Sequence, residues 1–175
     1  MRSSLVWPVD PSSAGDQLHM KKVRVPVRLV LDGGWRVQGD VWLVPIVEPA
    51  SERERVIDLL DAEEPFFPLD TTEGVILVRK SRIARLDVAS PVDAGLEDEP
   101  TGEVSSERVV IDLCGVPDDD GRLDGRLPWA SPPDRARLLD QVNGAGEWLP
   151  VERRDGLSLV ATRYIRSIIL ESSRG

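Results

Sequence analysis

The sequence predicts a mainly β (α+β) fold in which one small β-barrel occurs twice in tandem, each copy with one helix inserted between its second and third strands. Two observations lead to this fold class. Segments in the two halves of the chain match in the same order, and their apolar and polar residues alternate as in half-buried strands. One continuous α+β domain, in which the two copies share a sheet, is the alternative.

The repeat aligns residues 55–86 with residues 137–168 at an offset of 82, without a gap. Upstream the offset becomes 86, because the second copy has a shorter connection, and residues 36–39 meet residues 122–125. Two matching segments in one order indicate an internal duplication. Identical pairs in the longer segment are Arg55/Arg137, Asp58/Asp140, Pro68/Pro150, Gly74/Gly156, Leu77/Leu159, Val78/Val160 and Ile83/Ile165.

Two strands open the first copy. Residues 23–31 alternate apolar and polar side chains, which predicts a half-buried strand. The Asp-Gly-Gly sequence at 32–34 is a turn signal. Residues 35–44 predict a second strand, with a bulge or sharp bend at Gly39.

A helix follows in each copy. Ser51 and Glu54 have the spacing of a capping box at the start of residues 52–62, whose apolar side chains gather on one side. In the second copy Ser131 precedes two prolines, and proline suits the first helical position. The remaining elements expected in the first copy are a short strand at 66–69, a turn at Gly74 and a strand pair within 75–88. The corresponding segments of the second copy are 148–151 and 157–170.

The net charge of −9 is unevenly distributed. Residues 89–107 hold six acidic and no basic side chains, and their Pro, Gly and Ser content is typical of a solvated linker. Each flanking block has one acid more than it has bases, so neither is the strongly basic surface that phosphate binding favours. The expected organisation is a flexible leader at 1–20, a first copy at 21–88, the acidic linker at 89–107 and a second copy at 108–175.

Two segments of each copy resemble the motifs of Sm-like domains, which are small, strongly bent, five-stranded β-barrels. The first motif has a turn, a strand and a glycine at a bend. The second has two apolar residues, Arg-Gly and a further polar and apolar frame. The matching strings are GGWRVQGDV (33–41), DGRLDGRL (120–127), LVRKSRIARL (77–86) and LVATRYIRSI (159–168).

This resemblance implies an SH3-like or Sm-like barrel geometry. Sm proteins read RNA with an Asp-containing loop, an Asn and the Arg of the second motif, and of these the first copy retains Arg79. Lys80 stands where the family has Gly, and a helix-containing insertion replaces the loop after the second strand. Only the barrel geometry is therefore carried over. The string DLLDAEEPFFPL with LVRKSRI also resembles uncharacterised bacterial domains.

Residue types needed for common catalytic and metal sites are scarce. His19 is the single histidine and lies in the expected leader, and Cys114 is the single cysteine. Neither a histidine metal set nor an internal disulfide is therefore expected. The acidic run at 118–120 lacks the spacing of a calcium loop and predicts a turn. We expect no cofactor, no metal and no enzymatic activity, although a carboxylate-based active site needs no local motif.

A cytoplasmic location without membrane insertion is expected. No apolar run reaches the roughly 18 residues of a membrane helix. Residues 1–20 contain no apolar block of signal-peptide length, and a single cysteine suits a reducing compartment.

A basic cluster and two tryptophans are the interaction candidates. The leading hypothesis is a non-enzymatic intracellular adaptor or assembly subunit that binds another protein through barrel edges or exposed tryptophans. The alternative is a nucleic-acid or nucleotide-binding module that uses the basic cluster. Strand pairing at open edges would also allow a homo-oligomer. The candidate residues are Arg79, Lys80, Arg82, Arg85, Trp42 and Trp129.

Overall fold

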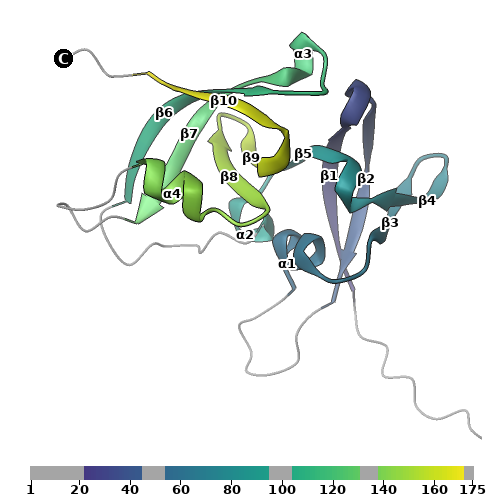
Figure 1. Cartoon of the computed structure of the whole chain (residues 1–175). Coiled ribbons are helices and arrows are strands. Elements are labelled where there is room, and N and C mark those ends of the chain that lie inside the picture. Colours follow the sequence, from purple (N-terminus) through teal and green to yellow (C-terminus); the bar gives the residue numbers. More distant parts are fainter. Residues whose placement is uncertain (1–21, 45–53, 95–103, 131–137, 172–175) are drawn as a thin grey trace, which may run out of the picture.

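The strands of the protein form one open, antiparallel sheet (Figure 1). The computed structural model describes residues 22–44, 54–94, 104–130 and 138–171. Within these residues ten strands pair in the order β10-β6-β7-β8-β9-β5-β1-β2-β3-β4. The strands are β1 (Val23–Leu31), β2 (Arg36–Leu43), β3 (Phe66–Thr71), β4 (Gly74–Arg79), β5 (Ile83–Val88), β6 (Val104–Leu113), β7 (Arg122–Ala130), β8 (Trp148–Arg153), β9 (Gly156–Ala161) and β10 (Ile165–Leu170). The helices are α1 (Val56–Asp61), α2 (Pro91–Ala94), α3 (Asp118–Gly121) and α4 (Leu138–Gly144), and 3₁₀ turns lie at Asp32–Gly34, Lys80–Arg82 and Thr162–Tyr164.

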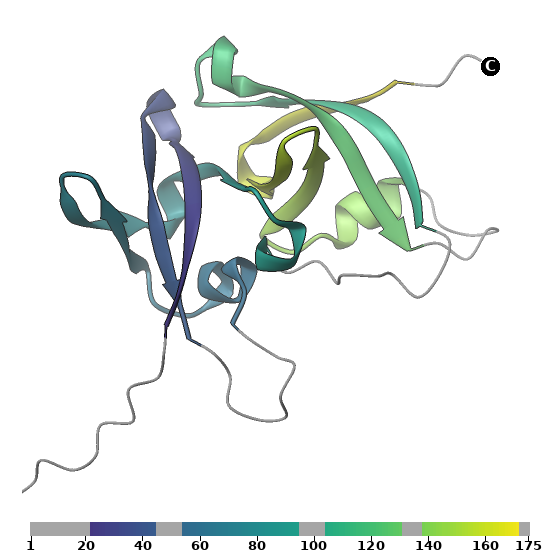
Figure 2. The same ribbon diagram turned by 180° about the vertical axis from the view of Figure 1, so that it is seen from behind.

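The two halves of the sheet have the same strand order. The first half runs β5-β1-β2-β3-β4 and the second runs β10-β6-β7-β8-β9. Their registers also correspond, because Val27 faces Gly39 in β1–β2 and Val109 faces Gly125 in β6–β7. In each half one register shift interrupts the pairing of the first strand with the last. Figure 2 shows the two halves side by side from behind.

The prediction of two small SH3-like or Sm-like barrels, each with an inserted helix, is wrong. The barrel prediction required each copy to close on its own strands, but β5 pairs with β1 on one side and with β9 of the other half on the other. Backbone N–H and C=O groups make these pairs, so the side-chain pattern that predicts a strand does not identify its neighbour. In sharing one sheet, the halves follow the alternative arrangement.

The acidic segment contributes regular structure at both of its ends. Residues 104–107, which the charge pattern places in the linker, form the start of β6, and α2 lies near the other end of the segment. The expected leader lies outside the described residues. No helix in the described part of the chain is long and apolar enough to cross a membrane.

Each hydrophobic cluster of the core takes side chains from both halves. In the first cluster, Trp148, Leu157 and Leu159 join the buried side chains of β1 to β5. In the second, Val30 and Ala84 join the buried side chains of β6 to β9. Removal of apolar surface from water therefore stabilises the association of the halves.

The hairpin turns of the two halves meet beside the sheet. The Gly33 N–H donates a hydrogen bond to the Gly115 carbonyl oxygen at 2.7 Å. Gly34 has a φ of 81°, a conformation that favours glycine, and a Cβ at this position would overlap the ring of Pro117. The expected turn at 32–34 is therefore present, and it is part of the contact between the halves.

Gly39 and Gly125 lie where neighbouring strands approach closely. A Cβ at Gly39 would lie 2.5 Å from the Asp70 carbonyl oxygen, and one at Gly125 would lie 2.6 Å from the Glu152 carbonyl oxygen. The β1–β2 register continues through Gly39 without a shift. This glycine therefore permits close packing of β2 against β3 and does not mark a bulge.

Asp58, in the first turn of the short helix α1, accepts hydrogen bonds from Arg55, the residue that precedes the helix. The Asp58 carboxylate accepts hydrogen bonds from the Arg55 backbone N–H at 2.9 Å and from the Arg55 Nε at 3.0 Å. The hydrogen bond from the Arg55 side chain lowers the Asp58 pKa below 3.8. The expected capping residue Ser51 lies outside the described residues, and the Glu54 carboxylate instead accepts from the Val44 N–H at 2.6 Å.

We expect Gly39→Ala to lower the free energy of unfolding by about 1–3 kcal/mol, because the added methyl group overpacks the β2–β3 contact. Gly144→Ala is the matched control, since nothing lies within 4 Å of a Cβ there. The control should leave stability unchanged or raise it by up to about 1 kcal/mol. Urea unfolding measures both variants, and equal stabilities would contradict the close approach.

Asp58→Ala should lower the free energy of unfolding by about 1 kcal/mol at neutral pH, because α1 loses its N-terminal acceptor. The folded-state pKa is depressed, so the stabilisation is present above pH 3.8 and is lost as the pH falls through the lowered pKa. The difference between variant and wild type should therefore shrink in urea titrations at acidic pH.

Asp61→Ala is the control on the same helix. Burial, with a smaller contribution from the charge of Glu147, raises the Asp61 pKa above 3.8. Ionised Asp61 therefore disfavours folding, and the replacement should not destabilise the protein at neutral pH. An Asp58→Ala effect that is constant with pH would refute the role of the carboxylate charge.

Candidate functional site

The first two members of the basic cluster are adjacent, at the end of β4 and the start of the turn that follows it, but they differ in exposure. Arg79 is exposed, and its guanidinium lies 5.9 Å from the centre of the Phe66 ring. Lys80 is buried, and its Nζ donates a hydrogen bond to the Ala62 carbonyl oxygen at 2.8 Å. One cation therefore faces solvent and the other is bound inside the fold.

The other two members of the cluster also differ in exposure. The Arg82 guanidinium is exposed and pairs with the Asp32 carboxylate at 2.8 Å. Arg85 is buried, with its Nε 3.1 Å from the Asp87 carboxylate and its Nη1 3.2 Å from the Asp120 carbonyl oxygen. The four cations do not form one exposed basic surface.

The tryptophans are placed on β2 and β7. Trp42 is 38% exposed and its ring lies 4.9 Å from the Arg24 guanidinium, which also pairs with Asp40 and Asp70. The side chain of Trp129 lies outside the described part of the structure. Trp35, which was not among the predicted interaction residues, is exposed and lies immediately before β2.

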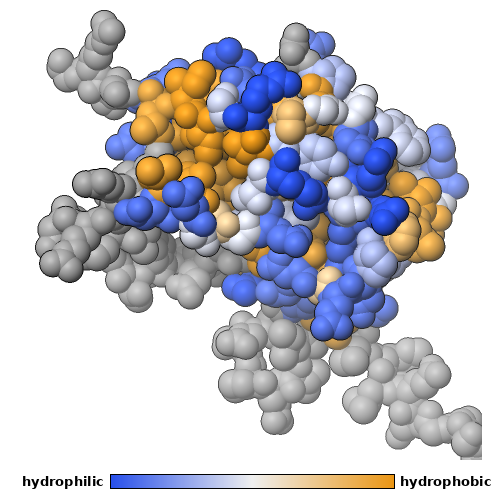
Figure 3. Space-filling model, viewed as in Figure 1, coloured by the Kyte–Doolittle hydropathy of each residue, from blue (hydrophilic) through white to orange (hydrophobic). Residues whose placement is uncertain are grey.

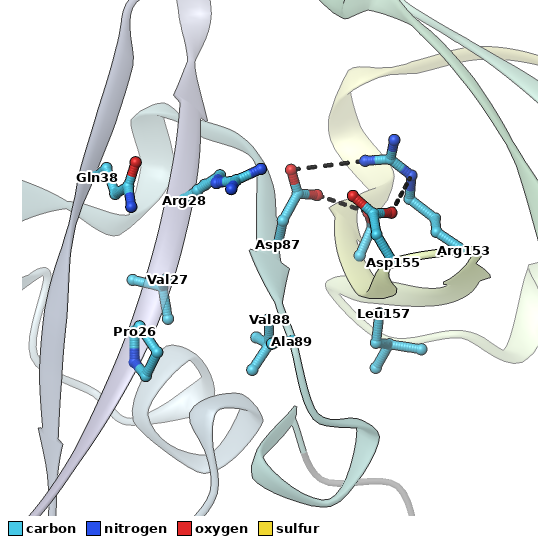
Figure 4. Close-up of a pocket in the computed structure, with 12 residues that line it drawn as sticks. Pro26, Val27, Arg28, Gln38, Asp87, Val88, Ala89, Arg153, Asp155 and Leu157 are labelled. Atoms are coloured by element: carbon cyan, nitrogen blue, oxygen red, sulfur yellow. Dashed lines mark hydrogen bonds and ion pairs between the residues drawn. The ribbon is translucent and has the colours of Figure 1, made fainter.

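A pocket of about 260 Å³ lies over the junction of the halves, between β1, β5 and β9 (Figure 4). Its floor carries Asp87, which accepts a hydrogen bond from the Ser158 hydroxyl at 2.6 Å. Arg85 lies 3.1 Å and Arg153 lies 3.7 Å from the same carboxylate. Two guanidiniums and a hydroxyl therefore compensate the charge of Asp87, and the Ser158 hydroxyl connects β5 to β9.

The contact between Asp87 and Ser158 could not be predicted from the local sequence. Asp87 is one acid in an alternating strand, and Ser158 is 71 residues away along the chain. Only the pairing of β5 with β9 brings them opposite each other. Among the described residues, no group of three or more His, Cys, Asp or Glu side chains is placed to hold a metal ion.

The outermost strands of the sheet, β4 and β10, carry exposed apolar side chains. No described strand pairs with the outer edge of either one, and we call them the free edges. Figure 3 shows hydrophobic side chains along β10 and at the β3–β4 hairpin, on opposite sides of this view. The exposed apolar residues of the free edges are Val75 and Leu77 on β4, and Ile169 and Leu170 on β10.

Equivalent strands inside the sheet are buried. Leu77 is 72% exposed, whereas Leu159, at the same position of β9, is 1% exposed. Val75 and its counterpart Leu157 differ in the same way, at 67% and 1%. β5 is buried over most of its length, and its counterpart β10 is not. β4 and β10 are thus as apolar as strands that are paired on both sides, but no described strand lies on their outer side.

No family model, no curated protein and no solved structure matches this chain. The resemblance to Sm-like domains therefore stays a prediction from the sequence.

We expect Asp87→Ala to lower the free energy of unfolding by about 2 kcal/mol, because the buried Arg85 guanidinium loses the nearer of its two carboxylate partners, Asp87 and Asp120. Asp155→Ala is the control, since Asp155 pairs with Arg153 at 3.8 Å on the surface and such pairs contribute less than about 1 kcal/mol. Chemical denaturation of both variants measures the difference. Equal effects would show that Asp87 does not stabilise the junction.

Proposed function

We propose that this protein is a non-enzymatic adaptor or assembly subunit whose free edges, β4 and β10, bind another polypeptide by strand addition. The observation that carries the proposal is the exposure of apolar side chains on both outermost strands. Their counterparts in the middle of the same sheet are buried.

An unpaired edge strand binds by two kinds of contact. Its N–H and C=O groups form backbone hydrogen bonds with an added strand, and its side chains provide specificity. Natural proteins block unused edges with charges, prolines, bulges or covering segments. Here β4 has Arg79 as its only charged residue and no proline, and β10 has only Arg166. The register shift of β10 against β6 does not block the edge, because β5 has an equivalent shift against β1 and still pairs with β9. Both edges therefore keep the composition of a binding strand.

We also propose that the two halves are copies of one ancestral unit. The repeat in the sequence supports this, as do the shared strand order and the corresponding registers of the halves. A duplicated unit carries two copies of each edge. One pair of edges is joined in β5–β9, which leaves β4 and β10 for a partner.

The burial of Lys80 and Arg85 gives no support to a nucleic-acid site on the basic cluster. Charged side chains that bind phosphate must reach it, and the two buried cations are held by Ala62, Asp87 and Asp120. Nucleic-acid binding is therefore an outcome that the experiment tests.

Affinity capture tests the proposal. We expect Leu77→Lys to reduce the amount of captured protein at least tenfold, because an edge lysine would be desolvated when a strand is added. The tagged chain is incubated with lysate of its source cells, with and without nuclease, and captured chains are quantified by mass spectrometry, with untagged copies of the chain included.

Leu139→Lys is the matched control, because Leu139 is similarly exposed but lies on α4. It should capture the same proteins as the wild type. Equal capture by both lysine variants would falsify strand addition at β4. Capture that disappears with nuclease would favour the nucleic-acid alternative.

A further inference from the structure

The junction between the halves is a head-to-tail contact. It pairs β9, the fourth strand of the second half, with β5, the fifth strand of the first half. Corresponding strands of the halves are β4 for β9 and β10 for β5, at the offset of 82 residues. The two outermost strands of the sheet, β4 and β10, are therefore the counterparts of β9 and β5, the two strands that form the internal junction.

We propose that the partner of the free edges is a second copy of this chain, with β4 of one molecule pairing antiparallel with β10 of the next. This inference rests on the proposed function and adds the identity of the partner. A contact between two different edges is heterologous, so it builds a ring when the rotation closes and a filament when it does not. Every molecule then uses both edges in the same way.

The internal junction sets the register of the proposed contact. Within the chain Leu86 faces Leu159 and Val88 faces Leu157. The intermolecular pairs follow when each β5 residue is replaced by its β10 counterpart, 82 residues later, and each β9 residue by its β4 counterpart, 82 residues earlier. These are Ser167 with Val78, Ile168 with Leu77, Ile169 with Ile76 and Leu170 with Val75.

The side chains at this register suit burial. Seven of the eight paired residues are apolar, and Ser167 at one end is the exception. Leu77 and Val75 are the most exposed apolar residues of β4, and they would become covered as Leu159 and Leu157 are in the internal junction. The central polar pair of that junction, Asp87 with Ser158, is replaced by Ile169 with Ile76. None of the eight paired residues is charged, and the charged side chains of Arg79 and Arg166 lie one position beyond the Ser167–Val78 end of the contact.

A two-fold contact of β4 with β4, or of β10 with β10, is the competing arrangement. The molecule contains no such pairing among its described strands, whereas it contains the β9–β5 contact that the proposal repeats. The two arrangements make different predictions for mixtures of variants, because only the head-to-tail contact needs one edge of each kind.

Complementation by edge variants tests the arrangement. Sedimentation velocity of the wild type should show species heavier than the monomer that increase with concentration. Leu77→Lys blocks β4 and Leu170→Lys blocks β10, so each variant alone should be monomeric. An equimolar mixture should form dimers and no larger species, because one intact β4 and one intact β10 remain. Leu139→Lys should sediment like the wild type.

Disulfide trapping tests the register. In a Cys114→Ser background, Ile76→Cys mixed with Ile169→Cys should give a covalent dimer on mild oxidation, since directly opposed Cβ atoms lie about 4.5–5.5 Å apart. Neither variant alone should give a covalent dimer. Ile76→Cys mixed with Arg166→Cys is the control for register, because position 166 is three residues away on the same strand, and it should give no covalent dimer.

The two proposals can fail separately. A wild type that is monomeric at all concentrations would overturn self-assembly, and the proposed function would stand if Leu77→Lys still lost the captured proteins. A dimer formed by Leu170→Lys alone would overturn the head-to-tail arrangement in favour of β4 with β4. Unchanged capture by Leu77→Lys would remove the proposed function itself.

Discussion

The backbone pairing of β5 with β9 is the contact on which the rest of the structure depends. It joins two five-stranded halves into one sheet, and it places Leu157 and Leu159 in a cluster with the first half. Their counterparts Val75 and Leu77 on β4, which has no described strand on its outer edge, are exposed. Arg163 and Tyr164 reinforce the same contact, since they donate hydrogen bonds to the carbonyl oxygens of Lys80 and Ser81 at 2.7 Å and 3.1 Å.

Local features of the fold could be predicted from the sequence, but the association of strands could not. The turn at 32–34 and the strand pair within 75–88 follow from glycines and alternation, which act over a few residues. The choice between a closed barrel and a shared sheet depends on which edge pairs with which. That choice is made by backbone groups and by side chains such as Asp87 and Ser158, far apart in the chain.

The candidate site shows the same limit. Arg79, Lys80, Arg82 and Arg85 are close in sequence, but the 3₁₀ turn at Lys80–Arg82 and the alternation of β5 send two of them inward. The apolar residues of β4 gave no signal of their own, because a strand at the edge of a sheet and a strand inside it can have the same apolar composition, as β4 and β9 do. Their exposure became informative only in comparison with β9 at the equivalent position.

The Asp87–Ser158 hydrogen bond also makes the pairing of β5 with β9 more specific. If β4 of another molecule replaced β9 beside β5, Asp87 would face Ile76 and lose its hydroxyl donor, and if β10 replaced β5 beside β9, Ser158 would face Ile169. Each exchange would remove the Asp87–Ser158 hydrogen bond, and an unsatisfied buried polar group such as the Ser158 hydroxyl costs about 1–3 kcal/mol. A chain with two similar pairs of edges thus carries one polar pair that keeps its own halves together and discourages strand exchange between molecules.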